Sequence, residues 1–126
     1  MENLKNKLIL IVDDHLRNTF ALTSYLESLD MNIDVVENGE EAIRYLKNGS
    51  RPDVILLDMM MPVMDGYETL AALKMDDNFR QIPVIAVTAN AMKGDREKCM
   101  EAGAWDYISK PVDLPILIDK LTKLIT

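Results

Sequence analysis

Five short apolar runs, separated by longer amphipathic segments, set the pattern of this chain. The runs cover residues 8–12, 33–36, 54–57, 84–87 and 107–109, and isoleucine, valine and leucine dominate the first four. The first, third and fourth runs are continuously apolar, which is typical of strands that are buried on both faces, whereas Asp34 interrupts the second run. We therefore expect five strands in a parallel sheet.

The segments between and after the runs are expected to form helices. In most of them apolar residues recur every three or four positions, which is the spacing of one buried helix face. The expected helices lie around residues 22–29, from about 40 to a stop at Gly49, from about 66 to near Met75, over 90–102 before Gly103, and from 114 to 125 after the candidate N-cap Asp113.

Five strand–helix units in succession predict an α/β fold, the flavodoxin-like (βα)5 three-layer sandwich. In this fold helices cover both faces of a parallel five-stranded sheet, and the strand order is 2-1-3-4-5. At 126 residues the chain is long enough for one such domain and too short for two. We therefore expect a single domain over residues 1–126.

Polar or charged side chains follow four of the five runs. Asp13 and Asp14 follow the first, Asp58 the third, Thr88 the fourth and Lys110 the fifth. Ligands of open α/β sheets bind at the carboxyl ends of the strands, so we expect these groups to meet in one pocket. Because Mg²⁺ prefers oxygen ligands, the carboxylates predict a Mg²⁺ site there.

The same groups suit phosphoryl transfer. A carboxylate can attack phosphorus and form an aspartyl phosphate. A metal ion, a fixed cation and a hydroxyl around the phosphoryl oxygens assist such a reaction. Lys110 and Thr88 supply the cation and the hydroxyl. We therefore expect the chain to take up a phosphoryl group.

Charge and composition limit the partners and the compartment. The formal net charge is −7, which argues against direct binding to nucleic acid. No apolar stretch approaches the roughly 18 residues of a membrane span, and the N-terminus lacks the layout of a signal peptide. Cys99 is the single cysteine, expected to be partly buried on the fourth helix, so there is no disulfide framework. These features predict a cytoplasmic protein that does not enter the membrane.

Four segments together resemble the receiver domains of two-component response regulators, over nearly the whole chain. They are residues 11–14 (IVDD), 57–66 (LDMMMPVMDG), 87–89 (VTA) and 107–111 (YISKP), each at the end of an expected strand. Residues 88–95 are further similar to receivers of hybrid histidine kinases and phosphorelays. The resemblance implies a signalling switch that catalyses only its own phosphorylation and dephosphorylation, with a histidine kinase or histidine phosphotransfer protein as partner.

The resemblance also implies a role for each matching residue at the acidic site. Asp58 is the expected phosphoacceptor. Mg²⁺ is expected to bind Asp14, Asp58 and the backbone carbonyl of Met60 directly, and Asp13 through water.

The remaining matches imply the parts of a switch. Lys110 is expected to pair with the phosphoryl group, and Thr88 to hydrogen-bond it. Tyr107 matches an aromatic residue that turns inward when Thr88 moves toward the phosphate. The Lys110–Pro111 bond is cis in the family. The expected readout is a changed surface on the fourth helix, the fifth strand and the fifth helix, with an unspecified downstream target.

Two positions beside the site set the lifetime of the phosphoryl group in the family, and Met60 and Asn90 occupy them here. Hydrolysis needs a water molecule in line with the bond that breaks, and a polar side chain can orient that water. Met60 cannot do this well, and its bulk is expected to screen the phosphorus. The sequence therefore predicts slow self-dephosphorylation.

Three other functions fit part of the pattern. A phosphatase of the haloacid-dehalogenase type also uses a strand-end Asp nucleophile, but its second Asp would stand at Met60. A flavodoxin shares the fold, but Asp13 and Asp14 would repel the phosphate of its flavin. A pseudo-receiver that only binds partners would not need the complete acceptor set. Whether the chain is a stand-alone regulator or a domain of a longer protein stays open.

Two residues outside these motifs have competing interpretations. His15 follows the acid pair. It could bind a metal or carry a phosphoryl group, but the favoured interpretation is a solvated loop residue. Trp105 precedes the fifth run, where exposure would suit a binding surface and burial would mean ordinary packing.

Overall fold

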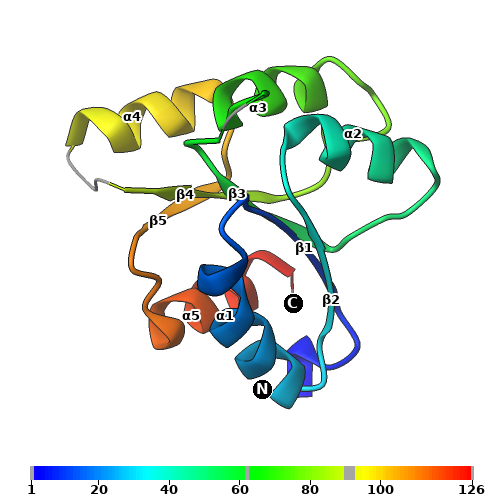
Figure 1. Ribbon diagram of the computed structural model, residues 1–126, viewed down its shortest axis with the longest axis vertical. Coiled ribbons are helices and arrows are strands. Elements are labelled where there is room, and N and C mark those ends of the chain that lie inside the picture. The colour runs from blue at the N-terminus through cyan, green and yellow to red at the C-terminus, as the bar shows by residue number, and fades with distance from the viewer. Residues whose placement is uncertain (1, 62, 90–92, 126) are drawn as a thin grey trace.

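The computed structural model describes residues 2–61, 63–89 and 93–125. Five parallel strands form one sheet in the order β2-β1-β3-β4-β5 (Figure 1). The strands are β1 (Leu8–Val12), β2 (Asn32–Val36), β3 (Val54–Asp58), β4 (Val84–Thr88) and β5 (Asp106–Ser109). The predicted fold class and strand order are confirmed.

Helices cover both faces of the sheet (Figure 1). On one face lie α1 (Leu16–Ser28), α5 (Leu114–Ile125) and the short 3₁₀ helix η1 (Glu2–Leu4). On the other lie α2 (Gly39–Lys47), α3 (Gly66–Lys74) and α4 (Lys93–Ala102). The expected start of the fourth helix at residue 90 falls outside the described residues. Within the described ranges, none of the helices combines the length and the apolar character needed to span a membrane.

The central strands are apolar up to Asp58 in β3 and Thr88 in β4, because both of their faces are buried. In β1, Ile9 and Ile11 pack with α1 and α5, whereas Leu10 and Val12 pack on the side of α2, α3 and α4. Strand β3 alternates in the same way, which explains why neither run shows a polar face. Burying each such side chain stabilises the fold by about 1.5–3 kcal/mol.

Local hydrogen bonds fix where helix α3 begins. Asp65 Oδ1 accepts from the backbone N of Glu68 at 2.9 Å, and Glu68 Oε1 accepts from the backbone N of Asp65 at 3.2 Å. This reciprocal pair is a capping box. It sets the first turn of α3 directly after the loop that leaves β3.

Gly66 allows α3 to start close against that loop. A β-carbon at Gly66 would lie 2.6 Å from the Met59 Cα and 3.0 Å from the Asp58 carbonyl oxygen. These are backbone atoms, so a larger residue would have to displace the chain beside Asp58. The position of the strand end therefore depends on the absence of a side chain here.

The capping box predicts a specific loss of stability. Replacing Asp65 by alanine should lower the free energy of unfolding in urea by about 1 kcal/mol, because the first turn of α3 loses its acceptor. The matched variant Asp65→Asn keeps an acceptor oxygen and should lose less. Equal losses in the two variants would contradict the capping role.

Candidate functional site

Two buried acids stand at the carboxyl ends of neighbouring strands. Asp13 follows β1, and its backbone N donates to the Val36 carbonyl at 3.0 Å, which extends the ladder one residue beyond the strand. Asp58 is the last residue of β3 and lies in register with Val87. The next backbone N, of Met59, donates to the Val87 carbonyl at 3.0 Å. The sheet itself therefore holds both acids in place.

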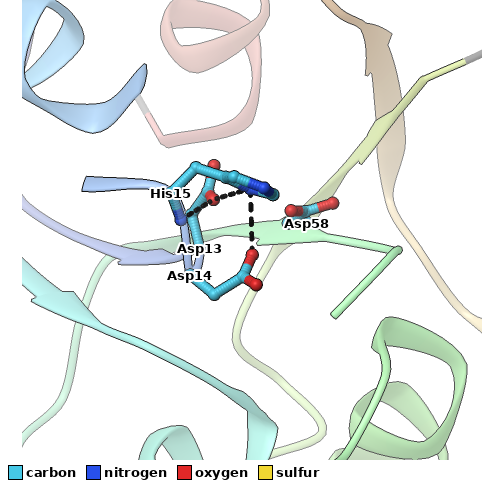
Figure 2. Close-up of side chains that lie close together, drawn as sticks. All are labelled: Asp13, Asp14, His15 and Asp58. Carbon is cyan, nitrogen blue, oxygen red and sulfur yellow. Dashed lines mark hydrogen bonds and ion pairs between the residues drawn. The ribbon is translucent and has the colours of Figure 1, made fainter. Parts of the chain in front are cut away.

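Three carboxylates and one imidazole gather at this edge (Figure 2). Ligand atoms of Asp13, Asp14, His15 and Asp58 all lie within 4.8 Å of one another. Asp13 Oδ1 accepts from the backbone N of His15 at 2.8 Å. Asp14 Oδ1 is buried but accepts no hydrogen bond from the described residues, and His15 Nδ1 lies 3.0 Å from it. Negative charge is thus concentrated around a point that a cation can occupy.

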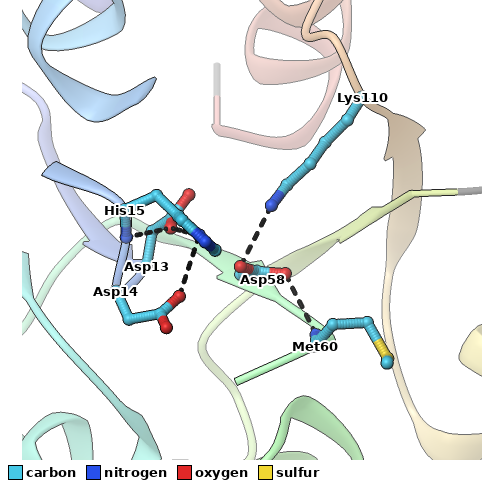
Figure 3. A network of polar contacts seen from close by, with 6 residues as sticks. All are labelled: Asp13, Asp14, His15, Asp58, Met60 and Lys110. Atoms are coloured by element: carbon cyan, nitrogen blue, oxygen red, sulfur yellow. Dashed lines mark hydrogen bonds and ion pairs between the residues drawn. The ribbon is translucent and has the colours of Figure 1, made fainter. Parts of the chain in front are cut away.

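Lys110 brings a positive charge to the same point from β5 (Figure 3). Its Nζ lies 3.1 Å from Asp58 Oδ2, and only 2% of the Asp58 side chain is exposed. Its backbone N donates to the Thr88 carbonyl at 2.7 Å, which ties the chain after β5 to the end of β4. The Lys110–Pro111 bond is cis, as the sequence led us to expect.

Thr88 and Met60 flank the acceptor candidate. Thr88 is buried at the end of β4. The backbone N of Met60 donates to Asp58 Oδ1 at 3.0 Å, so both Asp58 oxygens accept a hydrogen bond. The Met60 side chain is mostly exposed and extends away from Asp58 (Figure 3). The expected screening of a bound phosphorus by the Met60 side chain stays a prediction. Asn90 lies outside the described residues.

Tyr107, on β5, sits between two cations. Arg96 Cζ and Lys120 Nζ lie 5.9 Å and 5.2 Å from the centre of its ring. A hydrogen bond of 3.5 Å to the Tyr107 hydroxyl raises the pKa of Arg96 above its usual value. Lys120 also pairs with Asp106 at 3.0 Å. The ring therefore links α4, β5 and α5 through polar contacts.

A cavity of about 450 Å³ opens beside Asp58. One end of its lining is polar and the rest is apolar, supplied by strand ends, α1 and the chain after β5. The lining residues are Asp13, Asp58 and Lys110 with Ile11, Val12, Ala21, Leu22, Leu56, Val87, Pro111, Val112 and Leu114. The carboxylate of Asp58 is thus buried but reachable.

Trp105 lies at the opposite end of the strands from the acidic site. Its backbone N donates to the carbonyl of Val84, the first residue of β4, at 2.8 Å. The side chain is half-exposed and lines a second cavity, of about 330 Å³, together with Phe79 and Ile82. Trp105 is therefore separated from the acidic site by the length of β4.

Cys99 differs from its expected partial burial. It is fully buried on α4, with its Sγ 3.7 Å from the Tyr67 hydroxyl. Burial raises the pKa of Tyr67 to about 12, and the contact with Cys99 adds to the shift. Cys99 thus belongs to the packing between α3 and α4.

His15 combines features of both interpretations that its place in the sequence left open. It is exposed, as a solvated loop residue would be, with 56% of its side chain accessible. Its ring nevertheless turns back onto the acid pair, with Nδ1 3.0 Å from Asp14 Oδ1 and 3.3 Å from Asp13 Oδ1. The signal in the sequence was its adjacency to two acids at a strand end.

Residues 9–122 match the response regulator receiver domain family, and the chain belongs to this family. The polar-differentiation response regulator DivK of Brucella anthropi is 41% identical over 115 residues, which cover 91% of this chain and 93% of that protein. The general function is therefore that of a receiver domain, a signalling switch. Membership argues against the haloacid-dehalogenase and flavodoxin alternatives.

Solved structures agree with this assignment. The receiver domain of the sensor histidine kinase PA1611 from Pseudomonas aeruginosa PAO1 has 38% identity and a TM-score of 0.86, over 95% of this chain and 98% of that chain. Its crystal structure contains a magnesium ion coordinated in the active-site cleft. The co-crystal structure of the Saccharomyces cerevisiae histidine phosphotransfer protein Ypd1 and the receiver domain of Ssk1 matches with 26% identity and a TM-score of 0.89, over 97% of this chain and 90% of that chain.

The acidic cluster has the donor set that a small divalent cation requires. It offers carboxylate oxygens from Asp13, Asp14 and Asp58, and Mg²⁺ is usually bound by one or two carboxylates and several waters. The buried Asp14 Oδ1, which lacks a hydrogen-bond donor among the described residues, is an acceptor that such an ion would satisfy. The residues present therefore fit Mg²⁺.

The ion pair between Lys110 and Asp58 predicts an energetic coupling. Lys110→Ala leaves a buried carboxylate unpaired, and because the lysine head group is partly exposed we expect a loss of about 1–3 kcal/mol in unfolding free energy. In an Asp58→Asn background the same substitution should cost far less. Urea unfolding of the four proteins measures the coupling.

The exposed pair formed by Lys123 and Asp119 provides the control. Lys123→Ala should change stability by no more than about 0.5 kcal/mol. An equal effect of Lys110→Ala with and without the Asp58 charge would show that the pair is not coupled.

Proposed function

We propose that this receiver domain accepts a phosphoryl group on Asp58 from the phosphohistidine of a histidine kinase or a histidine phosphotransfer protein. The observation that carries the proposal is the Asp58 carboxylate itself. It is 2% exposed, contacts Lys110 Nζ at 3.1 Å and lies in a cluster of metal-compatible ligands at the mouth of a cavity. Its oxygens keep further lone pairs after accepting from Met60 and Lys110.

In the proposed reaction an Asp58 oxygen attacks phosphorus. The new P–O bond forms while the P–N bond to the donor imidazole breaks, and the imidazole keeps the bonding electron pair. Lys110 offsets the charge on the phosphoryl oxygens. Bound Mg²⁺ adds positive charge near those oxygens. Asp13, Asp14 and Asp58 would hold it, with the Met60 carbonyl as a further ligand.

The phosphorylated state differs from the free state by about −1.5 to −2 charges at the end of β3. Thr88 hydrogen-bonds the phosphoryl group and Lys110 pairs with it, contacts that exist only in the active arrangement and so shift the equilibrium toward it. Tyr107 then turns inward and leaves Arg96 and Lys120. The surface of α4, β5 and α5 changes as a result.

Two comparisons support this proposal. The PA1611 receiver holds magnesium in its active-site cleft, which favours the same ion at the acidic cluster of a chain 38% identical to it. The Ypd1 complex pairs a histidine phosphotransfer protein with a receiver of the same fold. A donor of that chemical class therefore fits this chain.

Intact mass spectrometry tests the acceptor. After incubation with acetyl phosphate and Mg²⁺, the wild type should gain one phosphoryl group, and Asp58→Asn should gain none. Removal of divalent ions with EDTA should abolish the reaction. Addition to Asp58→Asn would refute the assignment.

A protein donor separates the remaining alternatives. If acetyl phosphate fails, a phosphorylated histidine phosphotransfer protein should still transfer its group to the wild type. Failure with both donors, in a protein that binds Mg²⁺, would support a pseudo-receiver that only binds partners.

The side chain at position 60 should set the lifetime of the phosphoryl group. Met60→Asn provides a polar group to orient the attacking water. One hydrogen bond contributes about 1 kcal/mol, which corresponds to a roughly fivefold faster loss of phosphate. Met60→Leu is the matched apolar control and should leave the rate unchanged. Equal rates in all three proteins, measured by mass over time, would exclude a role for Met60.

A further inference from the structure

We propose that His15 is a metal ligand through Nδ1, and that it makes this site prefer later transition-metal ions such as Co²⁺ over Mg²⁺. The inference rests on the proposed function, in which the acidic cluster holds a divalent cation. It adds a nitrogen ligand to a site otherwise described by oxygen ligands alone.

The spacing of the candidate ligand atoms carries the proposal (Figure 2). His15 Nδ1 lies 3.0 Å from Asp14 Oδ1 and 3.3 Å from Asp13 Oδ1. In an octahedral site with bonds of about 2.1 Å, adjacent ligand atoms lie about 3 Å apart. The imidazole nitrogen therefore lies at ligand spacing from each of the two carboxylate oxygens, and ligand atoms of all three residues lie within 4.8 Å of one another.

The ring of His15 has no helix-capping role that would explain this position. His15 stands at the N-cap of α1, but its side chain makes no capping hydrogen bond. Its backbone N, not its ring, donates to Asp13 Oδ1 at 2.8 Å. Figure 3 shows the ring extending over the acid pair toward Asp58, on the same side as the Lys110 head group. The ring is thus directed into the cluster rather than along the helix.

The chemistry of the ligand atoms determines which ions bind more tightly. Imidazole is a ligand for transition metals such as Zn²⁺, Cu²⁺, Ni²⁺ and iron, whereas Mg²⁺ prefers oxygen and retains its waters. At sites with nitrogen and oxygen ligands, affinity rises from Mn²⁺ to Co²⁺ and Ni²⁺. The neutral ring can use the Nδ1 lone pair when its proton is on Nε2. A site of carboxylates and one imidazole therefore discriminates against Mg²⁺ more than an all-oxygen site does.

The chain offers an unambiguous spectroscopic test, because His15 is its single histidine. We would load tag-free wild-type protein with Mn²⁺ and measure pulsed electron paramagnetic resonance. Direct ligation should give a nitrogen coupling to the metal that changes when the protein is made with histidine labelled by ¹⁵N in the ring. The coupling should disappear in His15→Leu.

Calorimetry with Mg²⁺ and Co²⁺ measures the preference. His15→Leu should weaken Co²⁺ binding by at least about tenfold and Mg²⁺ binding by less than about threefold. His15→Asn should behave similarly toward Co²⁺ while providing an acceptable N-cap for α1, so a fold defect would not explain the result. Ser24→Ala, an exposed position on α1, is the control and should bind both ions like wild type.

The outcomes separate this inference from the proposed function. Mn²⁺ binding without a ring-nitrogen coupling, or equal losses of Co²⁺ and Mg²⁺ affinity in His15→Leu, would overturn the role of His15 and leave the Mg²⁺-dependent acceptor intact. A wild-type protein that binds no divalent ion would overturn both. Coupling to the ring together with a selective loss of Co²⁺ affinity would establish the ligand.

Discussion

Repulsion among three carboxylates at one edge of the sheet is the constraint to which the rest of the site responds. Two unit charges 4 Å apart interact by about 1 kcal/mol in water and about 4 kcal/mol at an effective dielectric constant of 20. The strand order 2-1-3-4-5 makes β1 and β3 neighbours, so the acids that follow them cannot move apart. Backbone N–H groups and Lys110 offset part of this repulsion.

The acidic site and the helices α4 and α5 are connected through the residues of β5 and the lysine that follows it. Lys110 directly follows the edge strand β5 and reaches Asp58, which ends the central strand β3. Within β5 itself, Tyr107 contacts Arg96 of α4 and Lys120 of α5. In the proposed switch, a change in the charge at Asp58 acts first on the end of an edge strand whose other residues already connect two helices. The surface could then change without movement of the central strands.

The sequence alone predicted the central strands well, because β1, β3 and β4 are buried on both faces and continuous apolar runs carry that information. The edge strand β2 is largely exposed instead, and its run contains the charged residue Asp34. The sequence also placed Asp13, Asp14, Asp58 and Lys110 at one edge, because the carboxyl ends of parallel strands must meet there. It did not predict which way side chains turn: the His15 ring toward the acids, or the Met60 thioether away from Asp58. Those directions depend on contacts between elements that are distant in sequence. Helix α4 shows the same limit, because its polar pattern gave no indication that Cys99 is fully buried.

The alternation of side chains along β3 determines where Asp58 is placed. Val54 and Leu56 belong to one hydrophobic cluster and Ile55 and Leu57 to the other, so a shift of the strand by a single position would exchange the two sets. Such a slip would also carry Asp58 about 3.3 Å along the strand axis and turn its carboxylate to the opposite face. Packing on both faces of β3 therefore determines the register of the strand. The four apolar residues before Asp58 thus fix its position along the strand and the face to which its carboxylate points.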